Sequence, residues 1–190
     1  MKKVSSRRFV IDASVARAST STDAKTGAGS QCRHALLGIL EICHHVVVTA
    51  AIRDEWRRHS SNFARRWLKQ MYSRRKVDTV DAPEDVELRR QIGRARASTS
   101  MRAAMLKDCH LLEAAMRTDG LIMSLDDEAR GLFADFAEHH DRSGRIVWVN
   151  PARPADETQA WLQAGAPSEA ERTLDSTRVR RAESKRAGTS

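Results

Sequence analysis

The sequence predicts an α/β fold with a mainly parallel, buried central sheet. Short runs of β-branched and apolar residues occur singly along the chain, and longer segments with helical spacing of apolar residues separate them. Single strands that alternate with helices are typical of a parallel sheet covered by helices. The chain has 190 residues, of which 41% are hydrophobic, and this is enough for one folded core.

Five short segments are predicted to form the strands. The first ends at Asp12, and the fourth leads into Asp126 and Asp127. Both acidic positions therefore follow the carboxyl end of a predicted strand. The predicted strands cover residues 8–11, 46–48, 77–80, 121–125 and 145–149.

The predicted helices lie between these strands. A segment rich in Ser, Thr and Gly at residues 19–30 is expected to be a loop. Ser98, Thr99 and Ser100 stand where a hydroxyl can cap the helix that follows. The predicted helices cover residues 31–43, 50–59, 62–73, 85–96, 101–118 and 127–140.

Residues 1–150 are predicted to form the folded domain, and residues 151–190 a C-terminal extension. Pro, Ala, Gly, Ser and charged residues dominate the extension, apart from the apolar pair Trp161 and Leu162. We expect this pair to dock on the domain. Residues 179–190 are basic and rich in small residues, and we expect them to be mobile.

Several classes of protein are excluded by the composition. No stretch approaches the 18 or more consecutive apolar residues of a spanning helix, and the basic N-terminus lacks the apolar core of a signal peptide. The three cysteines are widely separated and odd in number, which argues against a disulfide framework and favours the cytoplasm. No P-loop and no Gly-rich dinucleotide fingerprint is present.

Positive charge is concentrated in the middle of the chain. The net charge is +8, and residues 57–76 contain basic side chains without a single acidic one. Phe63, Trp67 and Tyr72 are interleaved with them, so this segment predicts either a nucleic-acid surface with stacking rings or a solvated helix face whose rings enter the core. The candidate RNA-binding residues are Arg57, Arg58, Arg65, Arg66, Lys69, Arg74 and Arg75.

Four acidic residues are candidates for one site. Asp12 and Asp126 follow predicted strands, Glu55 lies on the helix after the second strand, and Asp108 lies near the apolar face of its helix. Carboxylates that converge at a sheet edge repel one another, and a hard divalent cation relieves that repulsion. Each acid taken singly also has a structural explanation, as a helix cap or as the partner of a nearby Arg or Lys.

The order of these acidic segments resembles the motifs of the PIN-domain nucleases. Residues 8–15 (RFVIDASV) resemble the opening strand and Asp, and residues 46–56 (VVVTAAIRDEW) the second strand and helical Glu. Residues 107–115 (KDCHLLEAA) resemble the third motif, and residues 121–127 (LIMSLDD) the strand with the fourth acid. The family, which includes the toxins of VapC-type toxin–antitoxin pairs, implies a three-layer α/β/α sandwich with a mainly parallel central sheet.

The resemblance implies a metal-dependent endoribonuclease that hydrolyses RNA phosphodiester bonds. Asp12, Glu55, Asp108 and Asp126 would then hold one or two Mg²⁺ or Mn²⁺ ions. Asp127 would act through an outer-shell water, although helix capping is the simpler expectation for it. Ser14 and Ser124 would orient metal-bound water or phosphate.

The implied partners are RNA, an antitoxin protein and a second copy of the chain. The chain is longer than a minimal PIN toxin, and residues 151–190 lie outside the motifs. The alternative function is a non-catalytic nucleic-acid-binding PIN-like module with a degenerate acidic site. Stabilisation by Mn²⁺ would separate the two.

Overall fold

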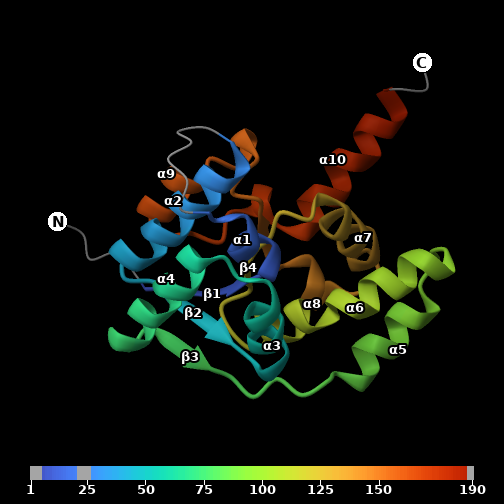
Figure 1. Ribbon diagram of the computed structural model, residues 1–190. Helices are drawn as coiled ribbons and strands as arrows, with labels where there is room; N and C mark the ends of the chain where they lie inside the picture. Colours follow the sequence, from blue (N-terminus) through green and yellow to red (C-terminus); the bar gives the residue numbers. More distant parts are fainter. Residues whose placement is uncertain (1–5, 21–26, 188–190) are drawn as a thin grey trace.

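The computed structural model describes residues 6–20 and 27–187 (Figure 1). The described residues contain five strands, which form one sheet in the order β3-β2-β1-β4-β5 with every neighbouring pair parallel. The predicted parallel sheet is therefore confirmed. The strands are β1 (Arg8–Ile11), β2 (His45–Val48), β3 (Val77–Thr79), β4 (Leu121–Met123) and β5 (Val147–Val149).

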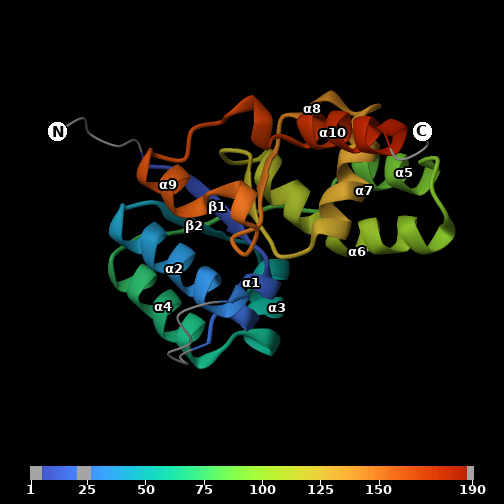
Figure 2. The same ribbon diagram turned by 90° about the horizontal axis from the view of Figure 1, so that it is seen from above.

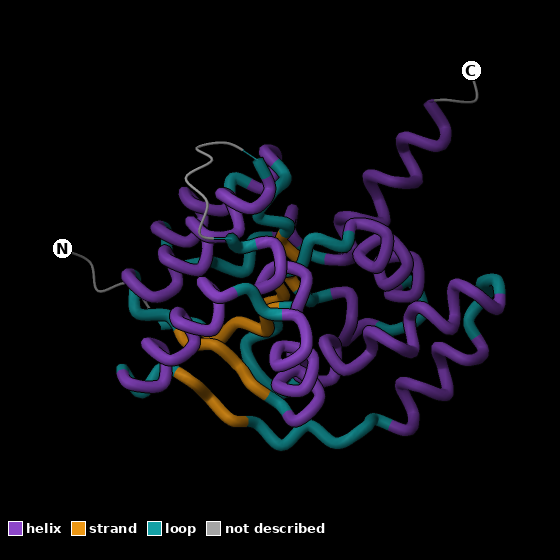
Figure 3. The backbone as a smooth tube through the Cα atoms, in the orientation of Figure 1, coloured by secondary structure: helices purple, strands orange, loops and turns teal. Residues whose placement is uncertain are grey.

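Helices cover both faces of the sheet, so the fold is a three-layer α/β/α sandwich (Figures 2 and 3). Right-handed crossovers put the helices of the first two connections on one face and those of the later connections on the other. The first group is α1 (Ala13–Ala18), α2 (Ala28–Glu41), α3 (Ala50–His59) and α4 (Asn62–Ser73). The second is α5 (Val86–Arg94), α6 (Thr99–Met116), α7 (Asp127–Ala137) and α8 (Asp141–Gly144).

The strand order reverses beside β1. From β1 the chain proceeds to β2 and β3 on one side, and it then crosses to β4 and β5 on the other. Two connections therefore leave the carboxyl ends of β1 and β4 in opposite directions. Ligand sites of open parallel sheets form at such a point.

The C-terminal extension packs on the domain through two separate helices. It comprises η1 (Pro154–Asp156), α9 (Thr158–Gln163), η2 (Ala170–Arg172) and α10 (Leu174–Ala187). Trp161 and Leu162 are buried, and the Trp161 ring meets Phe9 edge-on at 5.7 Å, so the expected docking of this pair is confirmed. α9 packs against α2 and α10 against α7.

Element boundaries differ from the predictions by a few residues. α2 begins at Ala28, inside the segment predicted to be a loop, and residues 21–26 of that segment lie outside the described residues. The Ser98 side chain caps α6 by accepting a hydrogen bond from Met101 N at 3.2 Å. Residues 179–187 belong to helix α10, and residues 188–190 lie outside the described part of the chain.

Two further expectations concern the cysteines and the membrane. Cys32, Cys43 and Cys109 are free thiols, in agreement with the absence of a disulfide framework. Burial raises the pKa of the Cys32 and Cys109 thiols to about 12. Among the described residues, no helix is long and apolar enough to cross a membrane.

Candidate active site at the carboxyl edge of the sheet

Asp12 lies at the reversal of strand order. Its backbone N–H donates to the carbonyl oxygen of Met123 at 2.9 Å, which extends the β1–β4 pairing by one residue. Asp12 occupies the N-cap position of α1, but its side chain makes no capping hydrogen bond. The helix cap that a single Asp at this position suggests is therefore absent, and the carboxylate is directed to other partners.

Two serine hydroxyls hold the Asp12 carboxylate in place. Ser14 Oγ and Ser124 Oγ donate to the same oxygen, Asp12 Oδ2, at 2.5 and 2.7 Å. Each hydroxyl also accepts a backbone N–H, from Leu125 to Ser14 and from Asp126 to Ser124, both at 3.1 Å. The two predicted auxiliary residues thus fix Asp12 and connect it to the end of β4.

Asp126 and Asp127 differ in role although they are adjacent. Asp126 Oδ1 accepts the Ala129 N–H at 2.7 Å and caps α7. Asp127 Oδ2 instead accepts from Asn150 Nδ2 at 3.1 Å. The simpler expectation that Asp127 caps the helix was therefore wrong, because a cap residue must precede the first helical turn and Asp127 lies inside it.

Asp108 shares an electrostatic environment with two of these acids. Its side chain is 21% exposed on α6. The pKa of Asp108 is raised, chiefly by burial and further by the charges of Asp12 and Asp126, while Lys107 and His110 oppose the rise. The acidic residue on α6 therefore feels the charges of the two acids that follow β1 and β4.

Glu55 on α3 contacts His110 on α6, a residue that the sequence analysis did not single out. The Nε2 atom of His110 lies 3.3 Å from Glu55 Oε2, and its Nδ1 lies 3.1 Å from the Lys107 carbonyl oxygen. Helix α3, which carries Glu55, is attached to the end of β1 because Trp56 Nε1 donates to the Ile11 carbonyl oxygen at 2.9 Å. The position of His110 two residues after Asp108 was visible in the sequence, but its contact with α3 was not.

The acidic residues fit a hydrated hard cation better than a closed metal cage. Carboxylate oxygens are the ligands that Mg²⁺ and Mn²⁺ prefer. However, within residues 6–20 and 27–187 no three His, Cys, Asp or Glu side chains are grouped closely enough to hold a metal ion together. Mg²⁺ usually keeps several of its waters, so it needs only one or two direct carboxylates.

The predicted basic cluster divides between different surfaces. Arg57, Arg65 and Lys69 border a groove of about 390 Å³ between α3 and α4 that also contains Tyr72. Its floor is apolar, and Glu55 is not part of its lining. Along α3, Arg58 lies on the same side as Glu55, whereas Arg57 lies on the groove side.

The three interleaved aromatic residues behave differently from one another. Trp67 is 2% exposed and donates to the Leu36 carbonyl oxygen at 2.6 Å, so it belongs to the core. Phe63 is partly buried, and the Arg33 guanidinium lies 5.7 Å from its ring centre. Tyr72 is 50% exposed, and it alone of the three is open for stacking with a base.

None of the eight basic side chains in residues 57–76 forms an ion pair with another described residue. Their charge is therefore available to an external polyanion.

Comparison of the chain with protein-family models, curated protein sequences and solved structures finds no match. The resemblance to PIN-domain nucleases therefore rests on the ordered motifs in the sequence.

Proposed function

We propose that this protein is a metal-dependent endoribonuclease that hydrolyses phosphodiester bonds of RNA. The observation that carries the proposal is that Asp12 and Asp126 follow β1 and β4, where the strand order reverses, and that their charges act on Asp108. The raised pKa of Asp108 supports it, because part of that rise comes from the two other carboxylates. Acids that destabilise one another at a ligand-binding edge are typical of a functional site.

In the proposed site one or two of Asp12, Glu55, Asp108 and Asp126 would bind Mg²⁺ or Mn²⁺ directly. The others, together with Asp127, would contact it through its waters. When bound, the ion would activate a water for attack on phosphorus and stabilise the negative charge that develops. Ser14 and Ser124 keep the Asp12 carboxylate in one orientation through their two hydrogen bonds to Oδ2. His110 lies beside Glu55, with Nε2 3.3 Å from Oε2.

The basic side chains outside the acidic edge attract the RNA. The acidic edge repels a polyanion, and the unpaired arginines and lysines of α3 and α4 offset this repulsion. In this proposal Arg58 contacts the RNA near Glu55, whereas Arg57, Arg65 and Lys69, which line the groove, contact the part of the RNA that enters it.

The proposal includes a toxin role with a cognate antitoxin, a homodimeric state and a cytoplasmic location. The free thiols support a reducing compartment. A short reading frame for an antitoxin beside the gene would support the toxin role, and the mass of the purified protein in solution would test the dimer.

The direct test replaces Asp12 by Asn. This change keeps the size of the side chain but removes the charge, so Mn²⁺-dependent cleavage of single-stranded RNA should fall below detection while the far-ultraviolet circular dichroism stays the same. Asp141→Asn is the matched control, because Asp141 is exposed at the start of α8, which precedes β5 at the opposite edge of the sheet. Equal cleavage by Asp12→Asn and the wild type would refute the nuclease mechanism.

The second candidate function is a nucleic-acid-binding module with a degenerate acidic site. The absence of a ready three-residue metal group among the described residues favours it. Thermal unfolding with and without Mn²⁺ separates the two candidates, since an ion that binds only the folded state raises Tm. A rise that is present in the wild type and lost in Asp12→Asn supports the nuclease, and no rise in either supports the module.

A further inference from the structure

A second basic surface lies where the C-terminal extension meets the domain. α10 packs along α7, and a cavity of about 420 Å³ opens between them and the loop after β5. Figure 2 shows the two helices next to each other. The cavity is lined by Asp127, Arg130, Gly131, Arg153, Thr177, Arg180, Arg181 and Ser184, and we call it the arginine pocket.

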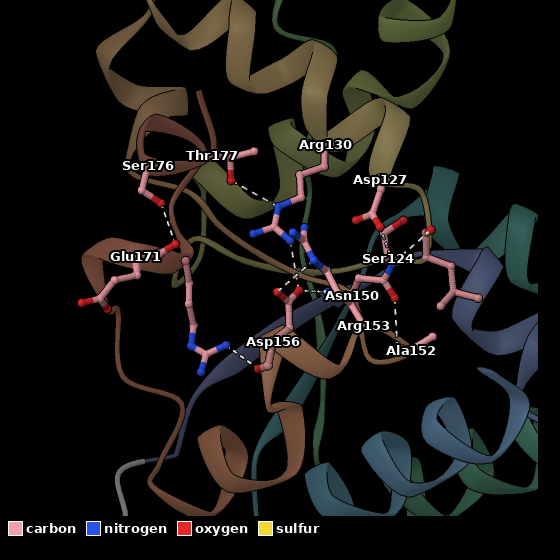
Figure 4. A network of polar contacts seen from close by, with 12 residues as sticks. Ser124, Asp127, Arg130, Asn150, Ala152, Arg153, Asp156, Glu171, Ser176 and Thr177 are labelled. Carbon is pink, nitrogen blue, oxygen red and sulfur yellow. Dashed lines mark hydrogen bonds and ion pairs between the residues drawn. The ribbon is translucent and has the colours of Figure 1, made fainter. Parts of the chain in front are cut away.

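A buried ionic network forms the inner wall of the arginine pocket (Figure 4). Arg130 is 2% exposed, and its Nη1 lies 3.0 Å from Asp156 Oδ2. Its Nε donates to Thr177 Oγ1 at 3.3 Å, which links α7 to α10. Asp156 Oδ2 also accepts the Asn150 N–H at 2.7 Å. This network fixes the pocket wall before any ligand arrives.

The same network connects the pocket to the acidic edge. Asn150 Nδ2 donates to Asp127 Oδ2 at 3.1 Å and lies 3.3 Å from the Leu125 carbonyl oxygen (Figure 4). Asp127 lines the pocket and is adjacent in sequence to Asp126. The arginine pocket is therefore contiguous with the end of β4, where two of the candidate metal ligands converge.

The pocket retains positive charge after its internal ion pairs are counted. Asp156 is the carboxylate partner of both Arg130 and Arg153, at 3.0 and 4.0 Å. Arg180 has no carboxylate partner among the described residues, and its Nη1 donates to the Glu171 carbonyl oxygen at 2.7 Å. Four guanidinium groups thus face three carboxylates, those of Asp127, Asp135 and Asp156.

Arg181 offers an unused donor on the same wall. Its Nη2 lies 3.4 Å from Asp135 Oδ2, but its buried Nε has no hydrogen-bond partner among the described residues. The guanidinium lies over Gly131, where a Cβ would overlap it. Gly131 thereby lets this arginine lie against α7, and an acceptor oxygen in the pocket would satisfy the Nε donor.

We propose that the arginine pocket binds a backbone phosphate of the RNA strand whose scissile bond lies at the acidic edge; this inference rests on the proposed function. Guanidinium groups bind phosphate oxygens through paired hydrogen bonds. Apart from Gly131, every lining residue is polar or charged, so the pocket has no aromatic side chain on which a base could stack. It therefore contacts the strand without reading its sequence.

The test compares two arginines of the same helix. Arg180 lines the pocket, whereas Arg178 lies 3.6 Å from Glu138 and does not line it. Binding of a labelled single-stranded RNA is measured by fluorescence anisotropy over a series of KCl concentrations, in EDTA so that no cleavage occurs. Loss of one phosphate contact should lower the slope of log K against log[salt] by about 0.7 in Arg180→Ala, and the slope of Arg178→Ala should equal that of the wild type.

Two more variants make the outcome decisive. Arg180→Lys keeps the charge and should restore most of the slope, which a purely structural role of the arginine would not produce. Arg153→Ala/Arg180→Ala should lower the slope by about 1.4. Equal slopes for Arg180→Ala and Arg178→Ala would refute the proposal that the arginine pocket binds an RNA phosphate. Because the measurement needs no cleavage, a slope loss confined to the pocket variants supports the pocket even if Asp12→Asn shows that the nuclease mechanism is wrong.

Discussion

The two basic regions of this protein differ in what surrounds their charges. In the groove between α3 and α4, Arg57, Arg65 and Lys69 border an apolar floor that includes Trp56 and Tyr72. In the arginine pocket between α7 and α10, the lining contains no apolar side chain. The groove suits a ligand with both an apolar face and a negative charge, and the pocket suits a bare anion.

The regions also differ in how they depend on the fold. Arg57, Arg65 and Lys69 of the groove are exposed side chains on the surface of two helices and have no ion-pair partners among the described residues, whereas Arg53, which also lines the groove, lies 4.0 Å from Asp54. Arg130 of the pocket is buried and holds α7, α10 and the loop after β5 together. Similar charge in the sequence can therefore belong either to a replaceable surface or to the framework of the protein.

The largest expected effect is on stability. Arg130→Ala leaves Asp156 buried without its closest cation and should lower the free energy of unfolding by about 3–5 kcal/mol. Arg57→Ala, in the groove, should change it by no more than about 0.5 kcal/mol. Urea unfolding followed by circular dichroism measures both. Similar losses in the free energy of unfolding of the two variants would mean that Arg130 stabilises the fold no more than the surface residue Arg57 does.

The next effect concerns how the groove binds RNA. Tyr72→Ala removes the exposed ring and should weaken binding of single-stranded RNA by about 1–3 kcal/mol without changing the salt slope. Arg65→Ala/Lys69→Ala should instead lower that slope by about 1.4. Fluorescence anisotropy in EDTA measures both quantities.

The control for the groove is Arg117→Ala/Arg142→Ala. This variant removes the same charge from exposed side chains near the start of β4, at the end of the sheet opposite the acidic edge. A slope loss as large as that of the groove variant would mean that RNA responds to net charge rather than to the groove.

The smallest expected effect is the pH dependence of stability. Because the pKa of Asp108 is raised in the folded state, its ionised form costs stability at neutral pH, and the cost disappears as pH falls through the folded pKa toward the ordinary value of 3.8. Asp108→Asn should therefore raise Tm at pH 7 by a few degrees, since 1 kcal/mol corresponds to about 2–4 °C at this chain length.

Differential scanning fluorimetry from pH 7 to below pH 4 would show whether the gain in Tm of Asp108→Asn vanishes at low pH. Lys107→Met is the comparison, because Lys107 lowers the pKa of Asp108 and its loss should increase the cost of ionisation. A gain for Asp108→Asn that is the same at every pH would mean that the carboxylate charge is not its cause.

The secondary structure was largely predictable because it depends on local patterns. The helices α3 and α4 match the predicted ranges at both ends, since each begins after a Ser or Thr cap whose side chain accepts a backbone N–H. The start of α2 was missed because Gly27, which precedes it, makes no side-chain cap. Local spacing likewise left the role of Trp67 open, because helical periodicity does not distinguish the core from a stacking surface.

The candidate site was predictable only in part. Asp12 and Asp126 were named from their positions after strands, Glu55 and Asp108 from their positions on helices, and Ser14 and Ser124 from the resemblance. In the structure both serine hydroxyls donate to Asp12, and the charges of Asp12 and Asp126 raise the pKa of Asp108. His110, Asn150 and the arginine pocket were not found. Their contacts join α3 to α6, the end of β5 to α7, and α7 to α10, and no local pattern encodes such pairs.

By itself, the sequence determined the alternation of strands and helices, the acids at the strand ends and the position of the positive charge along the chain. Burial of short apolar strands and helix capping are local in sequence, so a single chain reveals them. The tertiary structure decided the strand order that places β4 beside β1, the division of the basic cluster, and the packing of α10 on α7. These features depend on contacts between residues far apart in the chain, and close packing of the core determines which of those contacts form.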